Sequence, residues 1–377
     1  MKIVADNKIP FLYGALEPFS DIIYLPGREI TREMIHDADA LIIRTRTRCD
    51  EHLLEGTSVK FIATATIGFD HIDTAYCKKH NIFWTNAPGC NSSSVQQYIA
   101  SVLITLSHRR GFDLRNKSLG VIGVGNVGSK VVRLAEQLEM NVYLNDPPRQ
   151  RREGSCQFIS LEGIIRECDI ISLHVPLNPD GVDKTWQMID DSFLEKVNKD
   201  TIIINSSRGE VVHTTALKNA VRSGRVSAAV LDVWENEPLI DSELLHLTDI
   251  ATPHIAGYSA DGKANGTMMS VRALSKFFGL DINNWAPDDI PEPPESNIRI
   301  DCSNKSDDMI VQEAILATYQ VLEDDRRLRE SVSTFEQQRG EYPLRREFNA
   351  YRVILSDNRP DVQKRLKRLR FKVEING

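Results

Sequence analysis

The sequence predicts an α/β protein with two doubly wound parallel-sheet domains, followed by a small C-terminal α+β domain. Three observations indicate this class. The chain of 377 residues is too long for one typical core. Short apolar runs alternate with helical patterns over the first 280 residues, as they do where strands and helices alternate in a parallel sheet. A proline-rich segment at 286–297 then ends this pattern and predicts an extended linker.

The first predicted domain spans 1–95, and the segment 259–285 is expected to return to it as a helix that begins at Ser259 and ends near Leu280. Within 1–95, capping residues precede each helical pattern. Strands are expected at 3–6, 22–25, 40–43, 61–65 and 82–85, and helices at 31–38, 50–56 and 73–80.

A long amphipathic helix is expected at 92–109, and it leads into a second domain over 96–258. The last predicted domain, 298–377, reads strand, long helix from about 307 to 330, strand, helix, strand. In the second domain, strands are expected at 119–123, 141–145, 170–175, 201–205, 228–232 and 249–253, with helices beginning near Val127, Leu161, Asp191, Thr214 and Ser242.

The composition is that of an ordinary folded protein, with 41% hydrophobic and 26% charged residues. The net charge of −7 argues against a nucleic-acid binder, which usually presents a basic face. No apolar stretch approaches the roughly 20 residues that cross a bilayer. The six cysteines form no CxxC pair and no spacing with histidine that suits a metal. With no secretion signal at the start, we expect a cytoplasmic protein without bound metal.

One glycine-rich loop predicts a dinucleotide site. Gly123, Gly125 and Gly128 follow an apolar strand and open a helix, an arrangement that lets backbone and a helix N-terminus approach a pyrophosphate. Asn126 and Val127 complete this loop. Asp146 stands eighteen residues later at the end of the next strand, where a carboxylate accepts the adenosine ribose hydroxyls and repels a 2′-phosphate. The sequence therefore predicts a Rossmann-like domain that binds NAD, although Arg149 leaves some room for NADP.

Three residues at the ends of later strands suit hydride transfer at a hydroxy acid. Arg208 can hold a carboxylate with a bidentate guanidinium, His254 can take the hydroxyl proton, and Glu237 can orient that histidine. Each residue also has a purely structural interpretation. Arg208 could be a surface residue of a turn, Glu237 a charged loop residue, and His254 a buried histidine at a strand end. Their occurrence together, after a dinucleotide loop, favours the catalytic interpretation.

The chain resembles the D-isomer-specific 2-hydroxyacid dehydrogenases over about residues 40–275. The matching segments are ATIGFDHID, GVGNVG, HVPL, NSSRGEVV, LDVWENEP and TPHIAGYS. The resemblance implies that Arg208 anchors the substrate, that His254 is the acid/base and that Glu237 is its partner. It also implies that Ser206, Ser207 and Gly257 line the cofactor and that Asp232 lies near the nicotinamide carboxamide.

A basic segment is compatible with a phosphorylated substrate, which the resemblance to one branch of this family implies. Arg44, Arg46 and Arg48 alternate with Thr45 and Thr47 at a predicted strand end, where the arginines would share one face. The alternative is a solvated basic strand end. Similar enzymes use the positions of Thr45, Thr66 and Tyr258 for substrate, so these residues and Arg44 and Arg46 are the predicted substrate site.

Within that family, HIAGYSADGKANGT and FEQQRGEYPLRREF are similar to the branch that oxidises 4-phospho-D-erythronate on the route to pyridoxal phosphate. That branch implies a homodimer formed by the C-terminal domain. The apolar positions Ile310, Ile315, Leu316, Val321 and Leu322 suit such an interface, or else a packing face within one chain. The alternatives are oxidation of 3-phosphoglycerate or another D-2-hydroxy acid, and, more distantly, a NAD-sensing binding protein that resembles a co-repressor.

Overall fold

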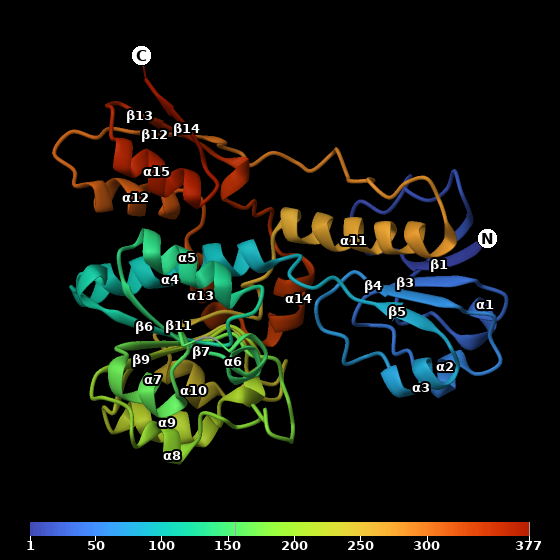
Figure 1. Ribbon diagram of the computed structural model, residues 1–377, viewed down its shortest axis with the longest axis horizontal. Helices are drawn as coiled ribbons and strands as arrows, with labels where there is room; N and C mark the ends of the chain where they lie inside the picture. The colour runs from blue at the N-terminus through green and yellow to red at the C-terminus, as the bar shows by residue number, and fades with distance from the viewer. Residues whose placement is uncertain (155, 377) are drawn as a thin grey trace. The chain divides into compact units, whose positions relative to one another are not determined.

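The structure is a computed structural model that describes residues 1–154 and 156–376. It divides into two compact units (Figure 1). The first unit comprises Met1–Asn91 and Ser259–Pro291, and the second comprises Ser92–Tyr258 and the chain from Glu292 onward. The predicted fold class is confirmed, because two parallel sheets are flanked by helices and a third, smaller sheet lies in the C-terminal part.

The sheet of the first unit has the order β2-β1-β3-β4-β5, and all its strands are parallel. Both of its faces are covered by helices, which explains why its strands read as short apolar runs. The strands are β1 (Lys2–Asp6), β2 (Asp21–Leu25), β3 (Ala40–Ile43), β4 (Phe61–Thr64) and β5 (Phe83–Thr85). The helices are α1 (Arg32–Ile35), α2 (Glu51–Leu54), α3 (Thr74–Lys79) and α11 (Ala260–Phe278).

Helix α11 covers one face of this sheet, and α1, α2 and α3 cover the other (Figure 1). Its glycines explain the close fit. A Cβ at Gly266 would lie 2.6 Å from the Ala65 carbonyl oxygen, and a Cβ at Gly262 would lie 2.8 Å from Cβ of Asn91. Part of the GKANGT pattern is therefore explained by the packing of this helix against the segments that follow β4 and β5.

The sheet of the second unit has the order β11-β10-β9-β8-β6-β7 and is also parallel. The chain leaves β6 toward β7 and then crosses back to β8, so a topological switch point lies between β6 and β8. The strands are β6 (Ser118–Ile122), β7 (Asn141–Asn145), β8 (Ile170–Leu173), β9 (Thr201–Asn205), β10 (Val226–Leu231) and β11 (Ile250–Ala251). The helices are α4 (Ser92–Arg110), α5 (Gly128–Gln137), α6 (Pro147–Glu153), α7 (Leu161–Glu167), α8 (Asp191–Leu194), α9 (Thr214–Arg222) and α10 (Ser242–Leu247), with 3-10 turns η1 (Leu114–Asn116) and η2 (Gly209–Val211).

Helix α4 corrects one expectation, because it is buried on all sides from Ser92 to Ser107 rather than amphipathic. Its polar residues have partners in the C-terminal part of the chain. Nε2 of Gln97 donates to the Arg346 carbonyl at 2.9 Å, and Oγ of Ser101 accepts from the Val321 amide at 3.1 Å. The C-terminal part therefore covers the face of α4 that the sequence pattern assigned to solvent.

The C-terminal part contains the parallel sheet β12-β13-β14 and four α-helices. The helix predicted over 307–330 is wrong as one element, since it is two helices separated at 317–320. Gln320 has an extended backbone there, and Oγ1 of Thr318 donates a hydrogen bond to the Ile315 carbonyl at 2.7 Å. The elements are β12 (Asn297–Ile300), α12 (Asp307–Leu316), α13 (Val321–Glu330), η3 (Val332–Thr334), α14 (Phe335–Gly340), η4 (Phe348–Ala350), β13 (Arg352–Leu355), α15 (Pro360–Arg368) and β14 (Lys372–Ile375).

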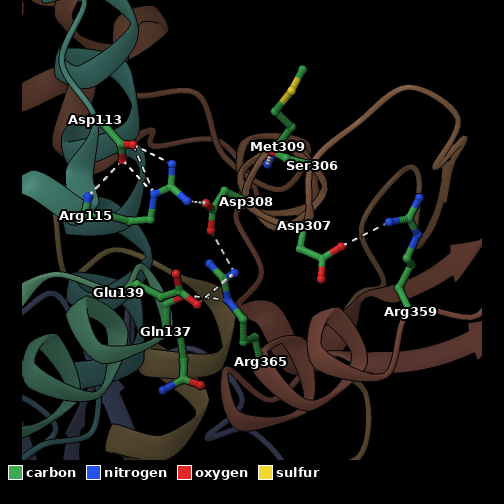
Figure 2. Close-up of polar contacts among 10 residues, drawn as sticks. All are labelled: Asp113, Arg115, Gln137, Glu139, Ser306, Asp307, Asp308, Met309, Arg359 and Arg365. Carbon is green, nitrogen blue, oxygen red and sulfur yellow. Dashed lines mark hydrogen bonds and ion pairs between the residues drawn. The ribbon is translucent and has the colours of Figure 1, made fainter.

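Polar contacts of buried and half-buried residues join this C-terminal part to the dinucleotide fold (Figure 2). Arg365, which is 9% exposed, donates from Nε to the Gln137 carbonyl at 2.7 Å and from Nη1 to Asp308 at 2.8 Å. Asp308 also pairs with Arg115 at 3.3 Å. The Gln137 carbonyl belongs to the last turn of α5, where backbone acceptors lack helical partners, so Arg365 caps the helix that follows the glycine-rich loop.

Three of the apolar positions proposed for a dimer interface pack within the chain instead. Ile310, Ile315 and Val321 are each 0% exposed and belong to one core with α4 and β6. Leu322 is 37% exposed. None of the helices that the structure describes is both long enough and apolar enough to cross a membrane.

Candidate active site

The glycine-rich loop joins β6 to α5 at the switch point of the second unit. Gly123 has φ of +86°, and a Cβ there would lie 2.6 Å from the His174 carbonyl oxygen at the end of β8. A Cβ at Gly128 would lie 2.0 Å from the Gly123 carbonyl oxygen. Both positions therefore require glycine for close backbone packing.

Gly125 differs from these two glycines, because a Cβ there would meet no described heavy atom within 4 Å. Asn126 beside it is exposed, and Val127 is the N-cap of α5, for which no side-chain hydrogen bond to the helix is seen among the described residues. The loop is thus open at Gly125, next to the N-terminus of α5, which fits a pyrophosphate.

Asp146 follows β7 and is positioned by the same loop. Its Oδ2 accepts from the Val124 amide at 2.8 Å, and its Oδ1 accepts from the Arg149 amide at 2.9 Å. Arg149 itself donates to the Val124 carbonyl at 2.6 Å and pairs with Glu153 at 2.8 Å. The guanidinium that could have met a 2′-phosphate is thus held by partners within the chain, while the Asp146 carboxylate stays beside the loop.

Arg208 lies in a tight turn after β9. Asn205 holds this turn, because its Oδ1 accepts from the Ser207 amide at 3.0 Å and its Nδ2 donates to the Arg208 carbonyl at 2.8 Å. A Cβ at Gly209 would lie 2.0 Å from the Trp234 carbonyl oxygen, so the turn packs directly on the loop after β10. Oγ of Ser206 is buried and has no hydrogen-bond partner among the described residues, so it is available to bind a polar group of a ligand.

Glu237 and His254 form a hydrogen-bonded pair at the ends of β10 and β11. Nδ1 of His254 lies 2.8 Å from Oε2 of Glu237, and Oε1 of Glu237 accepts from the Trp234 amide at 2.9 Å. The His254 amide donates to the Asp232 carbonyl at 2.7 Å, with φ of +57° at the histidine. An Nδ1 that faces a carboxylate leaves Nε2 as the atom able to accept a proton.

Asp232 is 1% exposed and organises the loop that carries the histidine. Its Oδ1 accepts from Thr252 Oγ1 at 2.7 Å and from the Ile255 amide at 2.8 Å, and its Oδ2 accepts from the Ala256 amide at 2.9 Å. Burial raises the pKa of this carboxyl, which the charge of His254 and these hydrogen bonds partly offset. Gly257 follows directly in the same loop.

The substrate residues expected in the first unit lie at the carboxyl ends of β3 and β4, which are neighbours in its sheet. β3 ends at Ile43, as predicted, and the chain then turns, with the Thr47 amide donating to the Arg44 carbonyl at 3.3 Å. Arg44, Arg46 and Arg48 therefore do not share a strand face.

These arginines differ in their surroundings. Nε of Arg44 donates to Oδ2 of the fully buried Asp6 at 3.0 Å, and its Nη2 donates to Oδ1 at 3.3 Å. Thr45 and Arg46 are exposed. Thr66, after β4, has its Oγ1 2.6 Å from Thr64 Oγ1 and 3.0 Å from the Gly68 carbonyl oxygen.

Sequence reasoning missed residues that support the site from a distance. Tyr98 in α4 lies with its hydroxyl 2.9 Å from Thr252 Oγ1, the group that donates to Asp232. The buried Arg345 donates from Nη2 to the Ala256 carbonyl. Asn205 and Trp234 stand inside matching motifs and could have been singled out, whereas nothing local in the sequence marks Tyr98 or Arg345.

Comparison with known proteins agrees with this geometry. Residues 92–256 match the family model "D-isomer specific 2-hydroxyacid dehydrogenase, NAD binding domain". The erythronate-4-phosphate dehydrogenase of Bacteroides fragilis is 52% identical over 357 residues, which cover 94% of this chain and 100% of that one. The chain belongs to the D-isomer-specific 2-hydroxyacid dehydrogenases. It is an NAD-dependent dehydrogenase, and its second unit contains the family's NAD-binding domain.

Further relatives support the family. The erythronate-4-phosphate dehydrogenase of Hahella chejuensis is 40% identical over 96% of each chain. The solved D-lactate dehydrogenase of Aquifex aeolicus with NAD and lactic acid is 27% identical, with a TM-score of 0.61 over 74% of this chain and 96% of that one. The NAD⁺-bound 3-phosphoglycerate dehydrogenase of Entamoeba histolytica is 25% identical, with a TM-score of 0.62 over 77% and 99%. Residues 291–369 match a domain of unknown function (DUF3410).

Proposed function

We propose that this dehydrogenase oxidises 4-phospho-D-erythronate at C2 to 2-oxo-3-hydroxy-4-phosphobutanoate, as a step of pyridoxal phosphate synthesis in the cytoplasm. The observation that carries the chemistry is the 2.8 Å contact between Nδ1 of His254 and Glu237, at the same sheet edge as Arg208. The substrate is supported by the names of relatives that match this chain over almost its whole length.

NAD, when bound, supplies the acceptor for the C2 hydride. The open space at Gly125 and the N-terminus of α5 suit its pyrophosphate, Asp146 suits its adenosine ribose, and Ser206, Ser207 and Gly257 suit the rest of the molecule. Asn126 and Val127 complete the loop. Asp232 acts in this proposal through the loop that it organises, because its carboxylate already accepts three hydrogen bonds within the chain.

Nε2 of His254 takes the proton of the C2 hydroxyl as the hydride leaves. Glu237 stabilises the imidazolium that forms, because a carboxylate beside a histidine favours its protonated state. Arg208 holds the substrate carboxylate, for which a planar guanidinium offers two parallel donors. The turn held by Asn205 limits the positions that Arg208 can adopt.

The phosphate is assigned to Arg46, Thr45 and Thr66 of the first unit. Arg44 takes part through its position beside these residues, since Asp6 already occupies two of its donors. A phosphate needs cationic and hydroxyl donors together, and the ends of β3 and β4 offer both.

The test is NADH formation with 4-phospho-D-erythronate, 3-phosphoglycerate, D-glycerate and D-lactate at equal concentrations. The proposal expects the highest kcat/KM for 4-phospho-D-erythronate, at least 100-fold above D-glycerate. A higher kcat/KM for 3-phosphoglycerate would make that acid the substrate, while the proposed hydride transfer would stand. No turnover of any 2-hydroxy acid, together with tight NAD binding, would favour the NAD-sensing alternative.

We also propose a homodimer formed through the surface of residues 298–377. Support comes from exposed apolar side chains there, of which Met309 is 53%, Leu344 46% and Leu322 37% exposed. Light scattering on the full chain should give about twice the mass of 42.6 kDa. A Leu344→Glu variant should dissociate more readily, and a monomeric wild type at micromolar concentration would refute the proposal.

A further inference from the structure

Arg345 joins the loop that follows His254 to the first turn of α4. Its side chain is buried, and its Nη2 donates to the Ala256 carbonyl at 2.5 Å and to the Ser94 carbonyl at 3.3 Å. The adjoining chain is also fixed on α4, because Oγ of Ser94 donates to Oε1 of Glu347 at 2.8 Å. All of these residues belong to the second unit. Arg345 therefore holds the carbonyl of Ala256 against a buried helix.

The guanidinium of Arg345 is itself fixed by aromatic rings. Its Cζ lies 4.5 Å from the ring centre of Tyr319 and 5.8 Å from that of Tyr342. The hydroxyls of both tyrosines donate to Oδ2 of Asp324, at 2.6 Å and 2.7 Å, and this residue is 2% exposed. The attraction between a cation and an aromatic face is stronger where water is excluded, so Arg345 has little freedom to move away from Ala256.

The contact with Arg345 also orients the N–H of Gly257. The Ala256 carbonyl and the Gly257 N–H belong to one trans peptide group, in which the two point in opposite directions. Arg345 on the carbonyl side therefore turns the Gly257 N–H to the other side, while Oδ2 of Asp232 accepts from the Ala256 amide at 2.9 Å. The Gly257 N–H has no hydrogen-bond partner among the described residues, and Gly257 is half-buried. This N–H is thus held in one orientation and available to a ligand.

We propose that Arg345 is a positioning residue for NAD, which fixes the Ala256–Gly257 peptide group so that the Gly257 N–H is offered to the nicotinamide carboxamide. A carboxamide oxygen accepts such a bond. Gly257 lies in the loop that Asp232 organises, and the family resemblance places Asp232 near this carboxamide. Arg345 itself does not touch the cofactor in this proposal. The inference rests on the proposed place of Gly257 in the NAD site, and it is independent of which hydroxy acid is the substrate.

The Arg345→Met variant should weaken the binding of NAD selectively. It keeps a long side chain but removes both donors, which frees the Ala256–Gly257 peptide group to rotate. The Kd for NAD should rise about fivefold, which corresponds to one net hydrogen bond. ADP-ribose lacks the nicotinamide and would be held by Gly125, the N-terminus of α5 and Asp146, so its Kd should stay within about twofold of wild type. A general loosening of the second unit would weaken both ligands alike.

Two further variants separate the contact with Ala256 from the packing around it. Tyr319→Phe removes the hydroxyl that donates to Asp324 but keeps the ring beside Arg345. It should lose stability, while both Kd values stay within about twofold of wild type. Arg345→Lys keeps the charge but offers one ammonium in place of the planar fork, so its Kd for NAD should lie between those of wild type and Arg345→Met.

The experiment is a calorimetric titration of the full chain with NAD and with ADP-ribose, in wild type and the three variants. Each titration is run below the melting temperature of the variant, which circular dichroism measures. No hydroxy acid is needed. A wild type that binds NAD but does not oxidise 4-phospho-D-erythronate would refute the proposed substrate and leave this test intact.

A rise in the Kd for NAD alone in Arg345→Met, absent in Tyr319→Phe, would support the inference. A Kd for NAD within about twofold of wild type, or an equal rise in the Kd for ADP-ribose, would overturn it. The same selective loss in Tyr319→Phe would overturn it too, because that variant keeps the bond to Ala256. If Arg345→Met does not fold, Arg345→Lys decides, and a Kd for NAD that rises no more than the Kd for ADP-ribose would overturn the inference.

Discussion

Two glycines of the cofactor loop should respond to alanine in different ways. A Cβ at Gly128 would lie 2.0 Å from the Gly123 carbonyl oxygen, whereas ordinary contact begins at 3.4 Å. The Gly128→Ala variant must therefore separate these backbone segments by 1.4 Å, the difference between the two distances. A Cβ at Gly125 would meet no described atom within 4 Å, so the Gly125→Ala variant needs no such movement.

The expected magnitudes follow from this contrast. Overpacking by one methyl group costs about 1–3 kcal/mol, and a backbone neighbour gives way less readily than a side chain, so we expect about 3 kcal/mol for Gly128→Ala. In a unit of this size, that loss lowers Tm by roughly 6–12 °C. Gly125→Ala should leave Tm within about 1 °C of wild type, because an alanine in open space adds no strain.

The Gly125→Ala variant should instead weaken NAD binding, although its stability is unchanged. The methyl group of Gly125→Ala occupies space that suits the pyrophosphate, so the Kd for NAD should rise at least tenfold, or about 1.4 kcal/mol, in a protein of normal stability. Calorimetric NAD titration and thermal melts of both variants would measure the two effects. If Gly125→Ala bound NAD as tightly as wild type, or melted as early as Gly128→Ala, the assignment of open space to the cofactor would be refuted.

Three further outcomes are expected. Glu237→Gln should lower kcat about 100-fold, because the imidazolium of His254 loses its carboxylate partner, while the Kd for NAD stays within about twofold of wild type. Steady-state rates would measure kcat and calorimetry the Kd, and a kcat within threefold of wild type would contradict the role of Glu237. Arg365→Met should lower the free energy of unfolding by about 2–4 kcal/mol, because it removes the cap on α5 and the ion pair with Asp308. Arg368 is exposed, so Arg368→Met should leave the thermal melting curve unchanged, and equal melting temperatures of the two variants would contradict the capping role of Arg365. Burial lowers the pKa of His174 from 6.5 to about 3, so between these values the unfolded chain binds one more proton and the equilibrium constant for unfolding should rise about tenfold per pH unit as pH falls below 6.5. Urea midpoints at pH 7, 6 and 5 measure this loss of stability, which His174→Asn should lack. The same pH dependence of the midpoint in wild type and His174→Asn would contradict the reasoning.

Much of the fold could be predicted, because local patterns specify it. The strands at 3–6, 40–43 and 201–205 were recognisable as short apolar runs that are buried on both faces of a parallel sheet. The glycine-rich loop and the Glu237–His254 pair could be predicted for a related reason. In a parallel sheet the carboxyl ends of neighbouring strands meet at one edge, so motifs that follow successive strands are brought together.

Other features could not be predicted, because the competing interactions come from distant parts of the chain. The chain turns after β3, so Arg44, Arg46 and Arg48 do not share a strand face, and Arg44 pairs with Asp6 on another strand. The segment 307–330 has a continuous helical pattern, yet it breaks before Val321, whose amide is bound by Ser101. Helical propensity is weak compared with such tertiary contacts.

Local sequence patterns were enough to specify the class of fold, the dinucleotide loop and the residues able to move a proton and hold a carboxylate, since each depends on residues close together in the chain or on the order of strands. The folded structure was needed to show which cations have partners within the chain, that α4 is buried on every side, and that Arg345 approaches the loop that follows His254. These features depend on burial and charge pairing between residues far apart in the chain, which the packing of whole elements brings together and no local pattern records.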